Sequence, residues 1–426
     1  MEKQVQQHEE FTLENGLKVG LCPMKHSGVI CGDLKCFHGA VHERQNEEGI
    51  AHLMEHVLFA GGTKSFSPEQ FHSSIEELGF WSARTSLSAI NHPTSFLPED
   101  IETYLKLSSE AFFSPAFHPD IVERERKTVL KEISERRTHA NRDFQLFRTA
   151  LFSGCPQSRD IIGNVDIVRS VTRELLLQFH QRGFSPNNVN LILAGALPEN
   201  MKELTEKYFG SIPRGEGKPF IFPTPPALEK PIIIQRPAPD MPPGKASIYL
   251  GFLGPASYTS QSSDFNCVNF LLGDGWSSYL LRELRMKRGL TYHASSNYEG
   301  PHNVGSIVVQ TQVDSERLEE TIDAIFSVFD GMKTTGIPPQ EVARTKKKLR
   351  YEIASNEHSH DGAINAVQKL WEYGITLEQY KNMFNLVTTE TVQKTAQKFL
   401  PERNGGYALL IRDGSFQNST DQAKEG

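Results

Sequence analysis

The 426-residue sequence predicts an α+β fold made of two homologous lobes, each a mostly antiparallel sheet with helices packed on it. Three observations predict this fold. The chain is too long for one simple core, and two domains of about 200 residues each are the natural expectation. A stretch rich in Pro and Gly interrupts the chain near its middle, and the second half repeats the helical pattern of the first.

The middle stretch reads Gly-Glu-Gly-Lys-Pro-Phe-Ile-Phe-Pro-Thr-Pro-Pro over residues 215–226 and breaks every hydrophobic periodicity. Such a density of Pro and Gly is typical of a linker between domains. We therefore predict an N-terminal domain at 1–214, a linker at 215–230 and a homologous C-terminal domain at 231–426.

The repeat is clearest in two segments, 101–133 and 321–353. Each contains a helical pattern, a break at a Pro, and a second helical pattern rich in charged residues. The segments are 220 residues apart, which places Glu352 in register with Glu132. The sequence therefore indicates a duplication in which both halves share one fold.

The other elements expected in the N-terminal half come from periodicity and turn signals. Residues 11–22 predict a hairpin whose type I′ turn lies at Asn15-Gly16. Ser67, followed by Pro68, predicts the N-cap of a helix. The remaining expectations, in chain order, are a strand over 27–38, helix 67–78, strand 79–86, helices 100–113 and 119–137, strand 187–196 and helix 199–208.

Composition narrows the class of protein. A formal net charge of −7 disfavours a nucleic-acid-binding protein, which needs a basic face. Five cysteines form no C-x-x-C pair, so we expect reduced thiols in a cytoplasmic protein. The polar, acidic start predicts neither a signal peptide nor a transit peptide. No apolar run reaches the ~20 residues of a membrane helix, and the polar tail after Gly414 predicts disorder.

The stretch His52-Leu-Met-Glu-His56 has the strongest chemical signal in the chain. Read as a helix, it places His52 and His56 one turn apart on one face, with Glu55 at its edge. Two such imidazoles can bind one divalent metal, and the nearby carboxylate can take a proton from a water beside it. H-x-x-E-H is the inverted form of the zinc-protease helix motif. The alternative is an amphipathic helix whose His and Glu side chains face solvent.

A catalytic zinc site of this kind needs a third protein ligand. Glu132 is the best candidate, because it lies in the strongly helical stretch 122–133, two turns after Glu125 on the same stripe. The alternative is a charged helix with solvated glutamates. His38 and His42 also have i,i+4 spacing, but they fall on a strand and turn, where we expect no convergence.

These residues resemble the pitrilysin-like M16 family of zinc metallopeptidases (inverzincins), in the half-length form of the processing peptidases. The matching segments are Gly39–Glu43, Gly49–Thr63, Glu125-Arg126 and Glu132.

The resemblance implies a role for each matching residue. It implies that His52, His56 and Glu132 bind Zn²⁺, that Glu55 is the catalytic base, and that Glu125 supports the site from behind the ligands. It also implies the fold of the LuxS/M16-like metalloenzymes, in which two lobes face each other across a chamber. The N-terminal domain would then bind the metal and catalyse the reaction.

The strand expected over 79–86 resembles the one on which this family holds an extended peptide by adding it to the sheet edge. We predict that Ser82, Ala83 and Thr85 bind the peptide substrate there. Ser82 stands where the family usually has Asn, and residues 89–93 are unusual, so substrate preference is expected to differ. The alternative is a plain strand that covers the core.

In the C-terminal half, residues 279–293 resemble the family segment whose Arg and Tyr, seven residues apart, reach the zinc. Arg285 and Tyr292 match this pair. The resemblance implies a catalytic role, because a guanidinium and a phenol are suitable donors for a developing oxyanion. The alternative is a surface Arg beside a half-buried Tyr. No H-x-x-E-H lies in this half, so we expect it to be metal-free.

The predicted function is a zinc-dependent endopeptidase that cleaves short unstructured peptides, as a peptide-processing or leader-removing enzyme. The half-length form usually dimerises, so we expect a homodimer or a heterodimer with a paralogous M16 subunit. The overall length resembles that of the catalytic subunit proposed for maturation of a subtilosin-type bacteriocin. The alternative is a non-catalytic scaffold or peptide-binding subunit, as some members of the family are.

Overall fold

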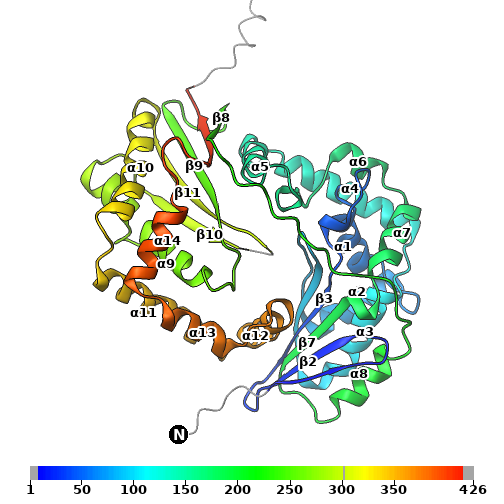
Figure 1. Cartoon of the computed structure of the whole chain (residues 1–426). Coiled ribbons are helices and arrows are strands. Elements are labelled where there is room, and N and C mark those ends of the chain that lie inside the picture. The colour runs from blue at the N-terminus through cyan, green and yellow to red at the C-terminus, as the bar shows by residue number, and fades with distance from the viewer. Residues whose placement is uncertain (1–7, 301–302, 416–426) are drawn as a thin grey trace, which may run out of the picture. The chain divides into compact units, whose positions relative to one another are not determined.

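The computed structural model describes residues 8–300 and 303–415, which form two compact units (Figure 1). Two sequence predictions concern the ends of the chain: no leader at the start, and disorder in the tail. Residues 1–7 and 416–426 lie outside the described residues. Each unit combines three segments of the chain. They are 1–136, 159–221 and 355–376 in unit 1, and 137–158, 222–354 and 377–426 in unit 2.

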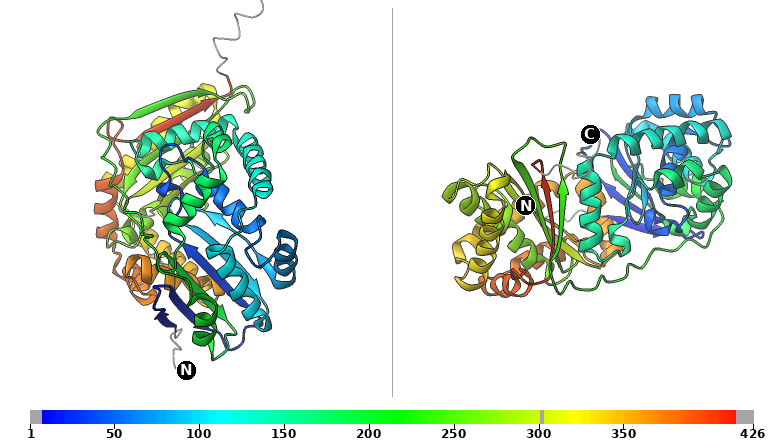
Figure 2. Two further views of the ribbon diagram at one scale, coloured as in Figure 1. Left: turned by 90° about the vertical axis from the view of Figure 1, so that its right-hand side faces the viewer. Right: turned by 90° about the horizontal axis from the view of Figure 1, so that it is seen from above.

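Unit 1 contains a seven-stranded sheet with the order β1-β2-β7-β3-β6-β4, in which β5 also pairs with β6. The paired strands are antiparallel, except that β2 and β7 run parallel. Figure 2 shows these strands side by side within the unit. Their bounds are β1 Glu9–Thr12, β2 Lys18–Pro23, β3 Ile30–Cys36, β4 Gly79–Trp81, β5 Arg84–Thr85, β6 Ile90–Phe96 and β7 Val189–Gly195.

Alternation along β7 gives this sheet two covered faces. Leu191 and Leu193 point into the main core with α1 and α3, whereas Ile192 and Ala194 pack against α12 on the opposite face. The helices of unit 1 are α1 Ile50–Ala60, α2 Pro68–Leu78, α3 Ile101–Phe113, α4 Pro119–Arg136, α6 Val165–Ser170, α7 Arg173–Gly183, α8 Met201–Phe209 and α12 His360–Tyr373.

Unit 2 contains a five-stranded sheet with the order β10-β11-β9-β12-β8, in which β12 and β8 are parallel. Leu409 and Ile411 of β12 point into the core with α9, α10 and α14, and Leu410 packs against α5. The bounds are β8 Ile232–Pro237, β9 Lys245–Gly254, β10 Ala294–Glu299, β11 Gly305–Asp314, β12 Ala408–Asp413, α5 His139–Leu151, α9 Ser262–Gly273, α10 Leu318–Thr334, α11 Pro339–Asn356, α13 Leu377–Leu386 and α14 Thr389–Phe399.

The predicted α+β fold with two homologous lobes is confirmed. Both sheets place their strands in the same spatial order, β2-β7-β3-β6 in unit 1 and β8-β12-β9-β11 in unit 2. Helices α4 and α11 each begin at a Pro and contain 18 residues. Each half also contributes one helix to the other unit, because α5 belongs to unit 2 and α12 to unit 1.

This exchange makes the units discontinuous in sequence. The chain passes from unit 1 to unit 2 at residues 221 and 222, inside the predicted linker. It also passes between the units at four other points. The predicted division into 1–214 and 231–426 has no boundary at any of these four points.

Two local predictions differ from the structure. The hairpin of β1 and β2 forms, but Thr12 pairs with Lys18 and leaves five residues in the loop. Only Gly16 in that loop has a positive φ, of 94°, whereas a type I′ turn needs two such residues, so the predicted turn type is wrong. The single strand expected over 79–86 is divided into β4 and β5.

Candidate metal centre

Helix α1 carries three of the predicted site residues, and Glu43 fixes its start. Gly49 precedes the helix with a φ of 96°, a conformation that favours glycine. Glu43 Oε1 accepts hydrogen bonds from the backbone N–H groups of Gly49 (3.1 Å) and Ala51 (3.0 Å). Most apolar side chains of α1 are buried in the main core, and the imidazoles of His52 and His56 lie side by side, their centroids 4.8 Å apart.

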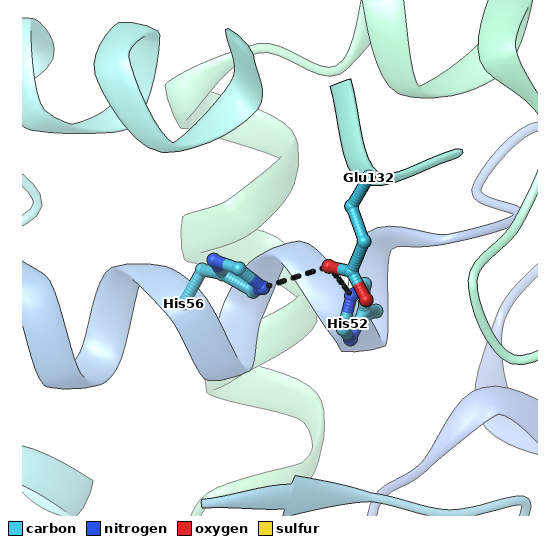
Figure 3. Close-up of side chains that lie close together, drawn as sticks. All are labelled: His52, His56 and Glu132. Atoms are coloured by element: carbon cyan, nitrogen blue, oxygen red, sulfur yellow. Dashed lines mark hydrogen bonds and ion pairs between the residues drawn. The ribbon is translucent and has the colours of Figure 1, made fainter. Parts of the chain in front are cut away.

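Glu132 reaches both histidines from α4 (Figure 3). Its Oε2 atom lies 3.0 Å from His52 Nε2 and 3.6 Å from His56 Nε2. Each of the three residues offers one donor atom, and these atoms lie within 4.8 Å of one another. No other such cluster of three His, Cys, Asp or Glu residues occurs in the part of the chain that the structure describes.

These distances suit a zinc ion. Ligands about 2.0–2.1 Å from a tetrahedral zinc lie roughly 3.3 Å from one another. The two distances between Glu132 Oε2 and the histidine nitrogens bracket this value. Two imidazoles and one carboxylate are also the ligand set of zinc peptidases, in which a fourth position stays open for water.

Two further carboxylates support the histidines. Glu125 Oε2 lies 3.4 Å from His56 Nδ1, a contact that leaves Nε2 of the same ring to face Glu132. Glu55 Oε2 lies 3.6 Å from His52 Nδ1 and accepts a hydrogen bond from the hydroxyl of Thr85. The predicted metal, base and supporting residues therefore lie together in unit 1.

Charged groups within the cluster shift one another's pKa values. Burial lowers the pKa of His52, but the carboxylates of Glu55 and Glu132 outweigh burial, so the pKa is raised. Burial raises the pKa of each carboxyl group, but the lowering contributions together outweigh burial, so the pKa values of Glu55, Glu132 and Glu125 are lowered. They come from the nearby histidines in all three cases, and also from the Thr85 hydroxyl for Glu55, Arg136 for Glu132 and Arg124 for Glu125.

The predicted substrate strand lies at the edge of the unit 1 sheet. Ser82 and Ala83 occupy the break between β4 and β5, and the Ser82 N–H donates to Pro93 O (3.1 Å). Thr85, at the end of β5, contacts Glu55. The structure thus connects Thr85 to the cluster, and shows no hydrogen bond from Ser82 or Ala83 to it among the described residues.

Arg285 and Tyr292 lie together in unit 2. The Arg285 guanidinium lies 4.3 Å from the centroid of the Tyr292 ring and 4.8 Å from that of Trp276. Arg285 belongs to the π-helix Leu281–Lys287, and Tyr292 is 79% exposed, not half-buried. Sequence reasoning missed Trp276, whose position three residues before Tyr279 has no chemical signal of its own.

The expectation that His38 and His42 would stay apart is wrong. The 3₁₀ turn Ala40–His42 brings the chain back on itself, and the two ring centroids are 4.6 Å apart. Both rings are largely buried, and His38 also packs against Phe179, with ring centroids 4.3 Å apart. No third ligand joins them among the described residues, so they form no metal cluster of the kind found at Glu132.

Both halves of the chain match descriptions of one protein family. Residues 33–164 match the insulinase domain of peptidase family M16, and residues 170–349 match the domain described as the peptidase M16 inactive domain. An uncharacterised zinc protease of Bacillus subtilis is 24% identical over 415 residues, covering 95% of this chain and 97% of the relative.

Two other comparisons extend the likeness. The beta subunit of the mitochondrial-processing peptidase of Dictyostelium discoideum is 26% identical over 198 residues, 46% of this chain and 42% of that protein. The crystal structure of a protease from Helicobacter pylori superimposes with a TM-score of 0.85 at 22% identity, covering 96% of this chain and all of the other. The latter likeness shows that the fold is shared.

Proposed function

Since this chain belongs to the M16 family of peptidases, we propose that it is a zinc-dependent endopeptidase. The observation that carries the proposal is the position of Glu132 Oε2, 3.0 Å and 3.6 Å from the Nε2 atoms of His52 and His56. Glu55 lies beside this cluster. Its Oε2 atom approaches Nδ1 of His52, whereas Glu132 approaches Nε2 of the same ring. The site therefore combines three ligands with a separate base.

The residues divide the chemistry among them. A bound zinc supplies Lewis acidity, which polarises the scissile carbonyl and acidifies water. His52, His56 and Glu132 would hold it, and Glu125 would orient the His56 ring. Glu55 takes a proton from the attacking water and returns it to the leaving amine. We propose that Arg285 and Tyr292 stabilise the developing oxyanion.

The finer proposal concerns the substrate and the assembly. A short unstructured peptide would add to the sheet edge at Ser82, Ala83 and Thr85, where main-chain pairing demands little sequence. The working form would be a homodimer or a heterodimer with a paralogous M16 subunit, and leader removal from a bacteriocin precursor is one such role. Among the described residues, no helix combines the length and apolar character needed to cross a bilayer. A cytoplasmic location remains a prediction from the cysteines.

A non-catalytic subunit is the second candidate. The match of residues 170–349 to a domain described as inactive favours it. That match covers most of unit 2 and does not include α1 or α4, which carry the cluster. A scaffold would also not need a general base such as Glu55 beside a full set of three metal ligands, so we prefer the peptidase.

The test is to purify the chain alone and with candidate paralogues, measure bound zinc, and assay a peptide library with and without a chelator. We expect chelator-sensitive cleavage that zinc restores. Glu55→Gln should keep the zinc and lose about 10²–10⁴-fold in turnover, because the base is removed. Glu76→Gln on the exposed face of α2 is the matched control and should remain active.

Two results would contradict the proposal. Protein that binds no zinc in any of these assemblies would support the non-catalytic subunit. Cleavage that survives both the chelator and Glu55→Gln would show that a different group performs the hydrolysis. Equal cleavage of folded proteins and short peptides would contradict the finer proposal on substrate class alone.

A further inference from the structure

We infer that Thr85 is a positioning residue for Glu55, which holds the carboxylate of the base in its working orientation. The inference rests on the proposed function, because it assigns a role within the same site. Thr85 Oγ1 donates a hydrogen bond to Glu55 Oε2, and the Glu55 side chain is only 14% exposed. The contact joins the short strand β5 to helix α1, elements that are 30 residues apart in sequence.

The hydrogen bond selects one oxygen of the carboxylate. Both the Thr85 hydroxyl and His52 Nδ1 approach Glu55 through Oε2. Within the described residues, the structure shows no hydrogen bond to Oε1. One oxygen is therefore held in place while the other stays available to accept a proton from water.

A rigid frame places Thr85 for this role. Thr85 pairs with Ile90, and Ser86 N donates to Ala89 O (2.8 Å), so β5 and β6 form a tight hairpin. The N–H of Ala40 donates to Ser86 O (3.2 Å) and that of Val41 to the next carbonyl, which anchors the hairpin tip.

The segment that anchors the hairpin also anchors the metal helix. Glu43, three residues after Ala40, accepts hydrogen bonds from the first N–H groups of α1. Gly39 fits closely at the same place, since an added Cβ would lie 2.4 Å from Ala89 N and 2.5 Å from Ser86 O. Residues 39–43 therefore hold both partners of the Thr85–Glu55 contact, so its geometry does not depend on two flexible side chains alone.

The kinetic test compares Thr85→Val, which keeps the side-chain shape, with Thr85→Ser, which keeps the hydroxyl. We expect Thr85→Val to lower kcat about 10–100-fold, because a misplaced catalytic group loses rate of this order. KM and bound zinc should not change, since the backbone of β5 and the three ligands are intact. Thr85→Ser should recover most of the wild-type kcat.

A control and a second readout separate positioning from stability. Thr205→Val removes a buried hydroxyl elsewhere in unit 1, one that donates to Met201 O (2.7 Å), and should leave kcat unchanged. In zinc-free protein, Thr85→Val should lower the melting temperature of unit 1 by about 3–6 °C when Glu55 is present. The shift should vanish in a Glu55→Ala background, because the two side chains would no longer interact.

The outcomes are distinguishable. Equal kcat in wild type and Thr85→Val, or an equal loss in Thr85→Val and Thr85→Ser, overturns the positioning role while the peptidase proposal stands. A melting shift that persists without Glu55 also overturns it, because the hydroxyl would act on another group. If the wild type shows no chelator-sensitive cleavage, the proposed function fails, and the melting-temperature comparison still decides whether Thr85 and Glu55 are coupled.

Discussion

Helices α4 and α11 have the same length and the same place in the repeat, but the glutamates at their fourteenth positions differ. Burial raises the pKa of Glu132 in α4, but the hydrogen bond with His52 and the charges of His52, Arg136 and His56 together outweigh burial, so the pKa is lowered. Burial also raises the pKa of Glu352 in α11; Lys348 lowers it only partly, and the pKa remains raised. The same backbone position therefore favours a charged carboxylate in one unit and disfavours it in the other.

The difference lies in the groups near each glutamate, which are His52 and His56 for Glu132 and Lys348 and Asp274 for Glu352. In unit 1, α1 packs against α4 and presents His52 and His56. In unit 2, the sequence of α9 contains neither His nor Glu, and its residues are almost all buried. The duplicated fold supplies a position for a carboxylate in both units, but among the described residues two imidazoles face it in unit 1 alone.

The largest predicted effect is the loss of Glu132, which is compared with the same change at Glu352. Glu132→Gln should weaken zinc binding by about 100-fold or more and remove activity at limiting zinc, because an amide is a poorer ligand than a carboxylate. Glu352→Gln is the matched change in unit 2 and should alter neither. Calorimetric titration with zinc measures the affinity of both variants. Equal losses of zinc affinity would show that the two glutamates do not differ in this role.

The exchanged helices give a second comparison, because α5 and α12 are held differently. Asp143 of α5 is 2% exposed and pairs with Arg412 (2.9 Å) and Arg236 (3.0 Å) in unit 2. Asp143→Asn should destabilise unit 2 by about 3 kcal/mol, since among the described residues it leaves the buried Arg412 with Asp240 alone as a charged partner. Hydrogen exchange of β8, β9 and β12 would measure the loss, and unchanged protection would show that apolar contacts alone hold α5.

The extent to which the sequence predicts these features depends on how local they are. The N-cap at Ser67 and the H-x-x-E-H motif of α1 involve residues within a few turns, so pattern alone predicts them. The apolar face of α5 shows that the helix is buried but not on which sheet, so the exchange could not be predicted. The approach of His38 to His42 depends on a 3₁₀ turn, and the Thr85 contact on a two-strand hairpin, neither of which has a sequence signal.

A third comparison concerns acid. Unit 1 contains buried histidines, among which burial lowers the pKa of His38 to about 3 and that of His180 to about 4. The described histidines of unit 2, His139 and His293, are exposed. Below the unfolded pKa of about 6.5, the unfolded chain binds protons that the folded unit 1 excludes, so stability is lost as pH falls.

His38→Phe isolates one of these contributions, because a planar ring can occupy the same space over Gly183. Between pH 7 and pH 5, a histidine kept neutral by the fold removes about 2 kcal/mol of stability. The variant should therefore lose about 2 kcal/mol less than wild type over this range, in urea unfolding of unit 1. The exposed His72→Phe is the control, and a pH dependence equal to that of wild type in His38→Phe would show that other groups cause the acid sensitivity.

The smallest predicted effect is at the contact that corresponds to Asp143 on the other exchanged helix. Lys35 and Glu372 of α12 lie 2.5 Å apart with side chains 17% and 25% exposed, so each retains contact with water. Lys35→Met keeps the apolar stem of the side chain and removes the charge, and it should change the stability of unit 1 by less than about 1 kcal/mol. The buried contacts of Ala363, Ile364 and Val367 should hold α12 without the ion pair. Hydrogen exchange of α12 would measure the change in stability. A loss of stability as large as that of Asp143→Asn would mean that both exchanged helices depend on their ion pairs, whether the pair is buried or partly exposed.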